Sequence, residues 1–180
     1  MRLFLERGYA ATTIPLIAAE SQVSRTSVFR YWGSKSEIVW SEFDEHTTRL
    51  GGLLAASDAE LPTMHAVRLQ VVENMRQSML ASALWLERFR VLESAPELRA
   101  EEAARWAAWA QVVAGFVAER HGFDVGDVVP QSIGAAVQAA FLAVLRRRLV
   151  PDEPAGELLL SLDEALQPLC AVLQEWLDRD

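Results

Sequence analysis

The amino-acid sequence predicts an all-α protein of about nine helices. Apolar residues recur every three to four positions along most of the 180 residues, and Ala, Leu, Glu and Arg fill these runs. No stretch alternates apolar and polar residues in the way a half-buried strand requires. Proline and glycine punctuate the runs and set the expected helix ends. The expected helical segments are 1–7, 13–20, 24–31, 34–56, 62–81, 83–93, 96–121, 130–150 and a last one from about 154.

Three features qualify these segments. The first is expected to be incomplete at its N-terminus, so that a basic N-terminal arm would be absent from this sequence. Gly51 and Gly52 are expected to form a weak point or bend in the fourth segment, because glycine destabilises a helix interior. Pro168 is expected to kink or split the ninth, because it lacks an N–H and clashes with the preceding turn.

Composition indicates a soluble globular protein of the cytoplasm. Hydrophobic residues make up 51% and charged residues 23%, which is enough apolar material for a core. The single cysteine, Cys170, has no partner for an internal disulfide, which favours a reducing compartment. The apolar stretch 135–145 is short and interrupted by Gln138, so no segment is expected to span a membrane.

Charge is distributed unevenly along the chain. The formal net charge is -8, yet residues 1–49 carry six basic and six acidic groups, so the excess of acid lies in 50–180. Residues 21–36 contain Arg25, Arg30 and Lys35 with no acid. On charge alone, a chance gap among the acids is the simpler explanation. A neutral end with a basic strip still fits a protein that contacts DNA at one end.

Residues 12–32 predict a helix-turn-helix. Thr13 is suited to cap one short helix and Ser24 to cap a second, with a tight connection through Gln22 between them. Val23 and Val28 are expected to point inward. In such a motif the second helix enters the major groove with its N-terminal residues leading. Short helix pairs also occur as plain structure, so spacing alone leaves this open.

The same region resembles the head of the TetR (tetracycline-repressor-like) family. The resemblance covers residues 3–38 and rests on Leu3-Phe4, Glu6, Gly8-Tyr9, Thr12-Thr13, Ile17-Ala18, Val23-Ser24, Phe29, Tyr31-Trp32, Ser34-Lys35 and Glu37. Three positions depart from the family pattern. Gln22 replaces a usual glycine, Phe29 a usual tyrosine and Trp32 a usual phenylalanine. The recognition-helix segment 24–32 also resembles an actinobacterial subgroup that includes mycofactocin-linked regulators.

The resemblance implies a DNA-binding domain at 1–40 and a helical effector-binding and dimerisation domain at 41–180. The DNA-contacting residues it implies are Arg25, Thr26, Ser27, Phe29, Arg30, Tyr31 and Lys35. Arg25 and Arg30 have the fork geometry for a guanine edge or a phosphate, and Tyr31 and Lys35 would hold phosphates. For Arg30, a solvated surface charge is an equal alternative.

The middle of the chain is rich in large apolar side chains, and the family encloses its effector there. The candidate ligand-binding residues are Asn74, Met75, Met79, Trp85, Phe89, Trp106, Trp109 and Phe116. For any one of them taken alone, ordinary core is the better explanation. Two tryptophans only three residues apart favour an aromatic-walled cavity.

The resemblance assigns homodimerisation to residues of about 130–149 and 155–178. The first range is lined with alanine and glycine. The second carries a stripe of apolar residues: Leu159, Leu162, Leu166, Leu169, Leu173 and Trp176. The basic run 146–148 is interpreted as a helix cap rather than a second DNA site.

The predicted function is therefore a bacterial transcriptional repressor that binds a palindromic double-stranded operator as a homodimer and is released by a small, largely apolar effector. No cofactor or metal is expected. A helical protein–protein adaptor without DNA binding, or a small helical enzyme, is the alternative. The enzyme is disfavoured because three histidines and one cysteine show no ligand or catalytic spacing.

Overall fold

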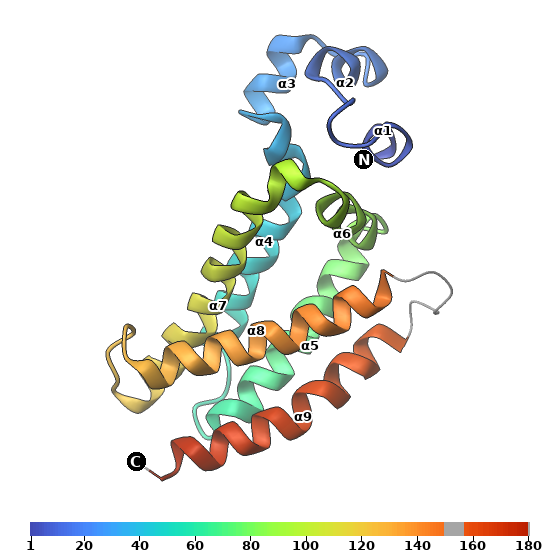
Figure 1. Cartoon of the computed structure of the whole chain (residues 1–180). Helices are drawn as coiled ribbons and strands as arrows, with labels where there is room; N and C mark the ends of the chain where they lie inside the picture. Colours follow the sequence, from blue (N-terminus) through green and yellow to red (C-terminus); the bar gives the residue numbers. More distant parts are fainter. Residues whose placement is uncertain (150–156, 180) are drawn as a thin grey trace.

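The computed structural model describes residues 1–149 and 157–179, and within them all regular structure is helical (Figure 1). This confirms the predicted all-α class. The helices are α1 (Arg2–Arg7), α2 (Ile14–Glu20), α3 (Arg25–Tyr31), α4 (Lys35–Ala55), α5 (Thr63–Ala81), α6 (Trp85–Ser94), a 3₁₀ turn (Pro96–Leu98), α7 (Arg99–His121), α8 (Val128–Arg148) and α9 (Glu157–Leu177). The expected end of the eighth segment and start of the ninth lie outside the described residues.

The molecule has a small head and a larger body. Helices α1 to α3 form the head at one end, and α4 runs from it into the body (Figure 1). In the body α8 packs between α7 and α9, while α5 packs against α4 and α9. The head therefore meets the body through α4 and through the contact of α1 with α6.

Side-chain caps start three helices where the sequence predicts them. The Thr13 hydroxyl accepts from Leu16 N at 3.4 Å, and the Ser24 hydroxyl accepts from Ser27 N at 3.0 Å. At α4 the Ser34 hydroxyl accepts from Glu37 N, and the Glu37 carboxylate accepts from Gly33 N at 2.7 Å. This reciprocal pair resembles a capping box. Local chemistry thus fixes where α2, α3 and α4 begin.

The turn between α2 and α3 is built on Gln22 in the left-handed region, at φ 55°. Gln22 N and Val23 N donate to Ala19 O and Ala18 O, which satisfies the last carbonyls of α2. An L-residue with a Cβ is disfavoured there relative to glycine. The strain expected from the glutamine is therefore present in the backbone. Val23 is 45% exposed, so its prediction as a core residue was wrong, whereas Val28 is buried.

Two expected breaks do not interrupt the helices. Helix α4 continues through Gly51 and Gly52, where it packs against α5 and α7. Helix α9 continues through Pro168, which is exposed. In both cases the packing of the apolar face outweighs the local preference, as tertiary contacts commonly do.

Helix α8 approaches α7 very closely. A Cβ placed on Gly134 would lie 2.4 Å from Ala110 O, so only glycine fits this contact. Contrary to expectation, α8 is long and apolar enough to cross a membrane by length and composition alone. The helix packs against α7 and α9 as part of the body.

We predict that Gln22→Gly stabilises the protein. Glycine adopts the left-handed conformation at little cost, so the free energy of unfolding should rise by about 0.5–1 kcal/mol despite the more flexible unfolded chain. Urea unfolding of wild type and variant measures the difference. Gln22→Ala is the control, because it removes the side chain and keeps the Cβ. An equal gain in both variants would contradict the backbone explanation.

Candidate nucleic-acid interface and ligand pocket

Helix α3 presents most of the predicted DNA-contacting residues to solvent. Phe29 is 53% and Tyr31 70% exposed, which is unusual for aromatic side chains in a folded domain. Arg25, Thr26 and Arg30 are also exposed, and Ser27 is half-buried. Val28, on the opposite side, is buried and anchors the helix in the head. The structure therefore brings these residues to one accessible end of the molecule.

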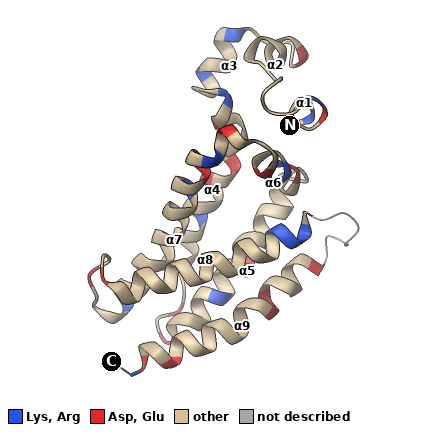
Figure 2. Cartoon of the chain, viewed as in Figure 1, with Lys and Arg blue, Asp and Glu red and all other residues tan. Residues whose placement is uncertain are grey.

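The charge of this surface is basic. No acidic residue lies in α3, and the two acids of α1 and α2, Glu6 and Glu20, are engaged by Arg2. Figure 2 shows basic residues along α3 and at the start of α4. The Arg25 guanidinium makes no ion pair or hydrogen bond with any described residue, while that of Arg30 lies 5.2 Å from the Tyr31 ring centre. These cations are available to an external anion such as a phosphate.

Lys35 has an internal role that the sequence did not reveal. Its ammonium donates to Tyr9 O at 2.8 Å and lies 3.9 Å from the centre of the Tyr9 ring. This contact joins the first turn of α4 to the loop after α1. Lys35 thus holds the head together in addition to any DNA contact it makes through its other two N–H groups.

Arg88 of α6 forms a polar link at the start of α4. Its guanidinium donates to Ile38 O at 2.6 Å and to Glu42 Oε1 at 2.6 Å. The side chain is only 16% exposed, so both bonds lie in a partly desolvated environment, where charged hydrogen bonds are strong. A third contact reaches Met1 Sδ at 3.4 Å. Arg88 therefore couples the position of α6 to that of α4 near the head.

A buried polar cluster joins α4 and α5. His46 is fully buried, and Asn74 Nδ2 donates to its Nε2 at 3.1 Å, which places the ring proton on Nδ1. Nδ1 then donates to the Ser78 hydroxyl at 2.8 Å, which also accepts from Arg49. Burial, with the charge of Arg49 adding to it, lowers the pKa of His46 to about 3. The histidine is therefore a neutral part of the core.

Four of the eight predicted ligand-binding residues, Trp85, Phe89, Trp106 and Trp109, belong to one packed aromatic cluster with Phe43 and Phe141. Phe43 and Trp106 have ring centres 4.7 Å apart, Trp85 and Phe89 4.8 Å, and Trp109 and Phe141 5.1 Å. These rings fill the space between α4, α6, α7 and α8 rather than surrounding a large empty volume.

Asn74 belongs to the polar cluster of His46, and its amide groups are engaged there: Nδ2 also donates to His46 O, and Oδ1 accepts from Arg49. Met75 and Phe116 are buried, and Met79 is half-buried.

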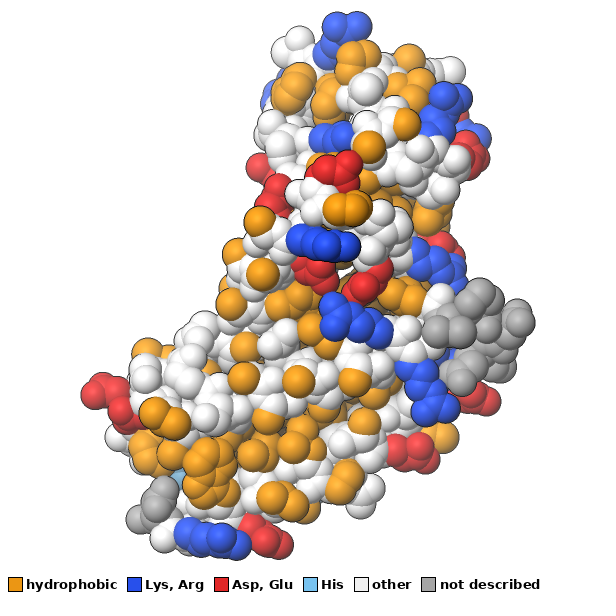
Figure 3. All heavy atoms as spheres, viewed as in Figure 1, with side chains coloured by type: hydrophobic (Ala, Val, Ile, Leu, Met, Phe, Trp, Pro, Cys, Tyr) orange, Lys and Arg blue, Asp and Glu red, His pale blue; other side chains and the backbone are white. Residues whose placement is uncertain are grey.

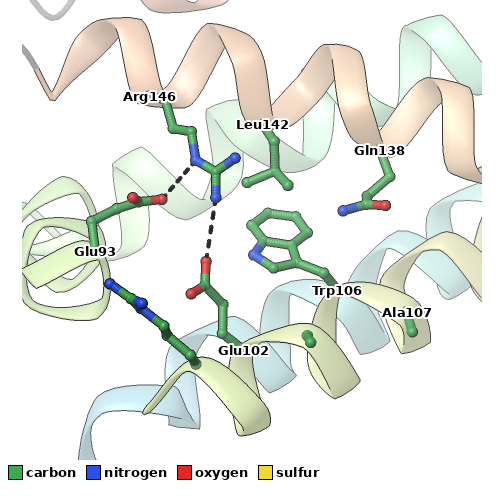
Figure 4. Close-up of a pocket in the computed structure, with 9 residues that line it drawn as sticks. Glu93, Glu102, Trp106, Ala107, Gln138, Leu142 and Arg146 are labelled. Atoms are coloured by element: carbon green, nitrogen blue, oxygen red, sulfur yellow. Dashed lines mark hydrogen bonds and ion pairs between the residues drawn. The ribbon is translucent and has the colours of Figure 1, made fainter. Parts of the chain in front are cut away.

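A pocket of about 560 Å³ opens beside this cluster, between the end of α6, the start of α7 and the end of α8 (Figure 4). Of the eight ligand candidates, Trp106 lines it. Trp85 lines a smaller pocket of about 110 Å³ that Arg49 and Ser78 share. The remaining six candidates line neither of the two: Asn74, Met75, Met79, Phe89, Trp109 and Phe116. The pocket beside Trp106 is lined by Glu93, Arg99, Glu102, Ala103, Trp106, Ala107, Gln138, Leu142 and Arg146.

The sequence did not point to the charged residues of this pocket. Arg146 was interpreted as a helix cap, yet it donates to Glu93 Oε1 at 2.8 Å and lies 3.7 Å from Glu102 Oε1. It thereby ties α8 to both α6 and α7. Burial, with Glu93 nearby adding to it, raises the pKa of Glu102 above its usual range. Only the opposite charges along α6, α7 and α8 signalled this network, and their pairing required the fold.

Comparison with known proteins identifies the family. The profile of the bacterial regulatory proteins of the TetR family matches residues 1–40, and that of the MftR C-terminal domain matches 61–174. The second match alone covers more than half of the chain. The chain belongs to the TetR family. TetR-family members are DNA-binding transcriptional regulators, so the prediction of a regulator rather than an enzyme is confirmed.

Individual TetR-family proteins are similar to this protein over nearly its whole length. A protein of Mycobacterium tuberculosis named as the mycofactocin biosynthesis transcriptional regulator MftR is 29% identical over 99% of this chain and 87% of its own length. The HTH-type transcriptional regulator TcmR of Streptomyces glaucescens is 29% identical over 94% and 78%. The crystal structure of the TetR family regulator PfmR from Thermus thermophilus shares the fold, with a TM-score of 0.54 and 19% identity over 97% of this chain and 93% of that one.

We predict that His46 makes the stability of this TetR-family protein depend on pH. The unfolded histidine binds a proton near pH 6.5, whereas the folded one binds it only near pH 3. Between these values the unfolded state holds more protons, so stability falls as pH falls, by about 1.4 kcal/mol per pH unit from this group.

Urea unfolding at pH 7, 6, 5 and 4.5 of wild type and His46→Gln measures this contribution. The variant has no titratable group at the site, and the difference in free energy of unfolding between the two proteins should narrow steadily below pH 6.5. Parallel curves for the two proteins would show that His46 is not the group responsible.

Proposed function

We propose that the protein is a homodimeric repressor that binds a palindromic operator through α3 and releases it when a small ligand binds the body. One observation carries the DNA-binding part: α3, which contains no acidic residue, exposes two arginines, Thr26 and two aromatic side chains. Arginine forks and aromatic faces are the side chains that read base edges and thymine methyl groups. The head at 1–40 is the proposed DNA-binding domain, and 41–180 the proposed effector and dimerisation domain.

An apolar surface on α8 and α9 supports dimerisation. Ala135, Ala139 and Ala143 are exposed at steps of four along α8, so they lie on one face of the helix. On α9, Leu160 is 59% and Val172 64% exposed. Figure 3 shows hydrophobic side chains spread over the face where α8 and α9 lie. Small residues on one helix beside large apolar ones on the next favour close helix packing between two copies.

Half of the apolar stripe predicted on α9 is buried in the core of the protomer, and the other half lies at the edge of this surface. Leu162, Leu166 and Leu173 are buried within the protomer, where α9 packs against α5 and α8. Leu159, Leu169 and Trp176 are half-buried at its edge. The proposed interface therefore uses the exposed side of α9 rather than the centre of the stripe. Residues 155 and 156 of the predicted dimer range lie outside the described residues.

DNA contacts should separate by kind. Arg25→Ala should cost on the order of 1–3 kcal/mol per half-site on the cognate operator and much less on random DNA, because it removes a base-reading fork. Tyr31→Phe should weaken both DNAs by a similar, smaller factor, since we propose that its hydroxyl binds a phosphate. It should leave the salt dependence unchanged, because no charge is lost.

The measurement is affinity for cognate and scrambled duplexes at several salt concentrations. The operator is first selected from a random duplex library. Arg179→Ala, at the end of the body farthest from the head, is the matched control and should change neither affinity. If Arg25→Ala weakens both duplexes equally, Arg25 is a phosphate contact. If the wild type selects no duplex at all, DNA binding through α3 is excluded.

The dimer interface predicts a specific disruption. Ala139→Arg places a large cation in a tightly packed apolar seam, where it would be desolvated without a partner, so the variant should be monomeric. Sedimentation velocity reports the change in mass. Ala104→Arg makes the same substitution at an exposed position of α7 and should remain dimeric. If the wild type is a monomer, or if the Ala139→Arg variant is still a dimer, the proposed interface is wrong.

A further inference from the structure

The pocket beside Trp106 combines an apolar inner wall with a charged mouth. Ala103, Trp106 and Ala107 come from α7, and Gln138 and Leu142 come from α8. Figure 4 shows Leu142 and Gln138 descending from α8 toward the indole of Trp106. At the mouth, Glu102 lies below Arg146 and Glu93 faces Arg146 from the side. An occupant therefore meets apolar groups within and ionic groups at the entrance.

The two carboxylates of this pocket are already engaged. Arg146 binds Glu93 at 2.8 Å and stands 3.7 Å from Glu102, so one guanidinium serves two carboxylates. The Glu102 side chain is 16% exposed, so its charge is the most desolvated of the four that line the pocket. An arriving cation would have to compete with Arg146 for both carboxylates. The site is therefore poorly suited to a cationic ligand.

Three polar groups of the pocket make no hydrogen bond with a described residue, and each of them carries an N–H donor. Arg99 lines the mouth, and its guanidinium forms no ion pair or hydrogen bond with any described residue. The indole N–H of Trp106 is buried, faces Glu102 and does not reach hydrogen-bond geometry with any acceptor. The amide of Gln138 also has no partner among the described residues. Of these groups the Trp106 donor is buried, where a missing acceptor is costly, whereas Arg99 is exposed and Gln138 half-buried. A ligand that brings acceptors can pair with all three.

We propose that this pocket binds an organic oxyanion with an apolar body, a carboxylate or a phosphate ester, and that its anionic group pairs with Arg99 and competes with Glu93 for Arg146. The apolar body packs against Trp106 and Leu142. This proposal rests on the effector role in the proposed function and specifies the chemistry of that effector. Arg99 opens α7, so an anion beside it also faces the positive end of that helix dipole.

Replacement of Glu93 by the ligand anion as the partner of Arg146 would change the contacts of α6. Glu93 ends near the pocket, and Arg88, one and a half turns earlier on the same helix, holds the start of α4. When the ligand anion takes the place of Glu93, α6 loses its tie to α8. The change then reaches α4, and through it the head, by the bonds from Arg88 to Ile38 O and Glu42.

The test compares ligands that share one apolar chain and differ in the polar end. Decanoate, decyl phosphate, decanol and decylamine, each below its micelle concentration, are titrated into the free full-length protein by calorimetry. Decanoate or decyl phosphate should bind at least tenfold more tightly than decanol, and decylamine no better than decanol. The tighter of the two anions identifies the headgroup. Equal affinity for decanoate, decyl phosphate and decanol, or a preference for decylamine, overturns the proposal.

Three variants locate the binding. Arg99→Gln removes the charge but keeps a polar side chain at a position that makes no hydrogen bond or ion pair with a described residue, and it should reduce the preference for anion over decanol to threefold or less. Ala103→Trp fills the pocket and should abolish binding of all four compounds. Arg76→Gln, on an exposed part of α5 outside the lining, should change nothing. Unchanged anion binding in Arg99→Gln or in a folded Ala103→Trp overturns the assignment.

The readout is independent of DNA. Binding is measured on free protein, so a failure to find an operator leaves the result intact. The converse outcome is an anion that binds the pocket without weakening a verified operator complex. That result would contradict the proposal that displacement of Glu93 transmits a signal to the head, but it would leave the chemical class of the ligand unchanged. Glu93→Gln, which removes the competitor from Arg146, should raise anion affinity severalfold. A fall in affinity would overturn the exchange.

Discussion

Helix α4 belongs to both parts of the molecule, and the relation of head to body depends on it. Its 21 residues span about 31 Å, with one end in the head and the other in the core of the body. Lys35 ties its first turn to Tyr9 O, and Leu50 and Leu54 are fully buried near its last turns. Because one continuous helix serves both ends, the orientation of α3 is set by whatever α4 packs against.

Helix α6 is the part of the body best placed to act on α4. Within its ten residues, Arg88 bonds to the start of α4 and Glu93 bonds to Arg146 of α8. The Arg88–Glu42 pair is largely shielded from solvent, whereas the Glu93–Arg146 pair is exposed, so the second is the weaker of the two and the easier to exchange. A ligand that alters one bond changes the equilibrium at the other. By linkage, DNA that favours one position of α4 must weaken that ligand by the same factor.

The sequence predicted the head in more detail than the body, and the reason is physical. Caps at Thr13, Ser24 and Ser34 and the turn at Gln22 are interactions between residues at most a few positions apart, so their chemistry is visible in the sequence. The body depends on contacts between distant segments. Arg146 follows its two carboxylates by more than forty residues, and nothing local distinguishes a pocket-lining arginine from a helix cap. Val23 was misassigned because it lies in the turn directly after Gln22, where no helical periodicity indicates which side faces solvent.

The aromatic residues show why a ligand site is harder to predict than a core. Tryptophans at steps of three or four residues indicate a buried helix face, and a core and a cavity wall share that pattern. What distinguishes them is the polar groups between the rings. The indole N–H groups of Trp40, Trp106 and Trp109 are buried without acceptors, and an unmet donor costs about 1–3 kcal/mol. All three lie on α4 and α7, and Trp106 borders the pocket, so one of these unmet donors adjoins the place where a ligand would supply an acceptor.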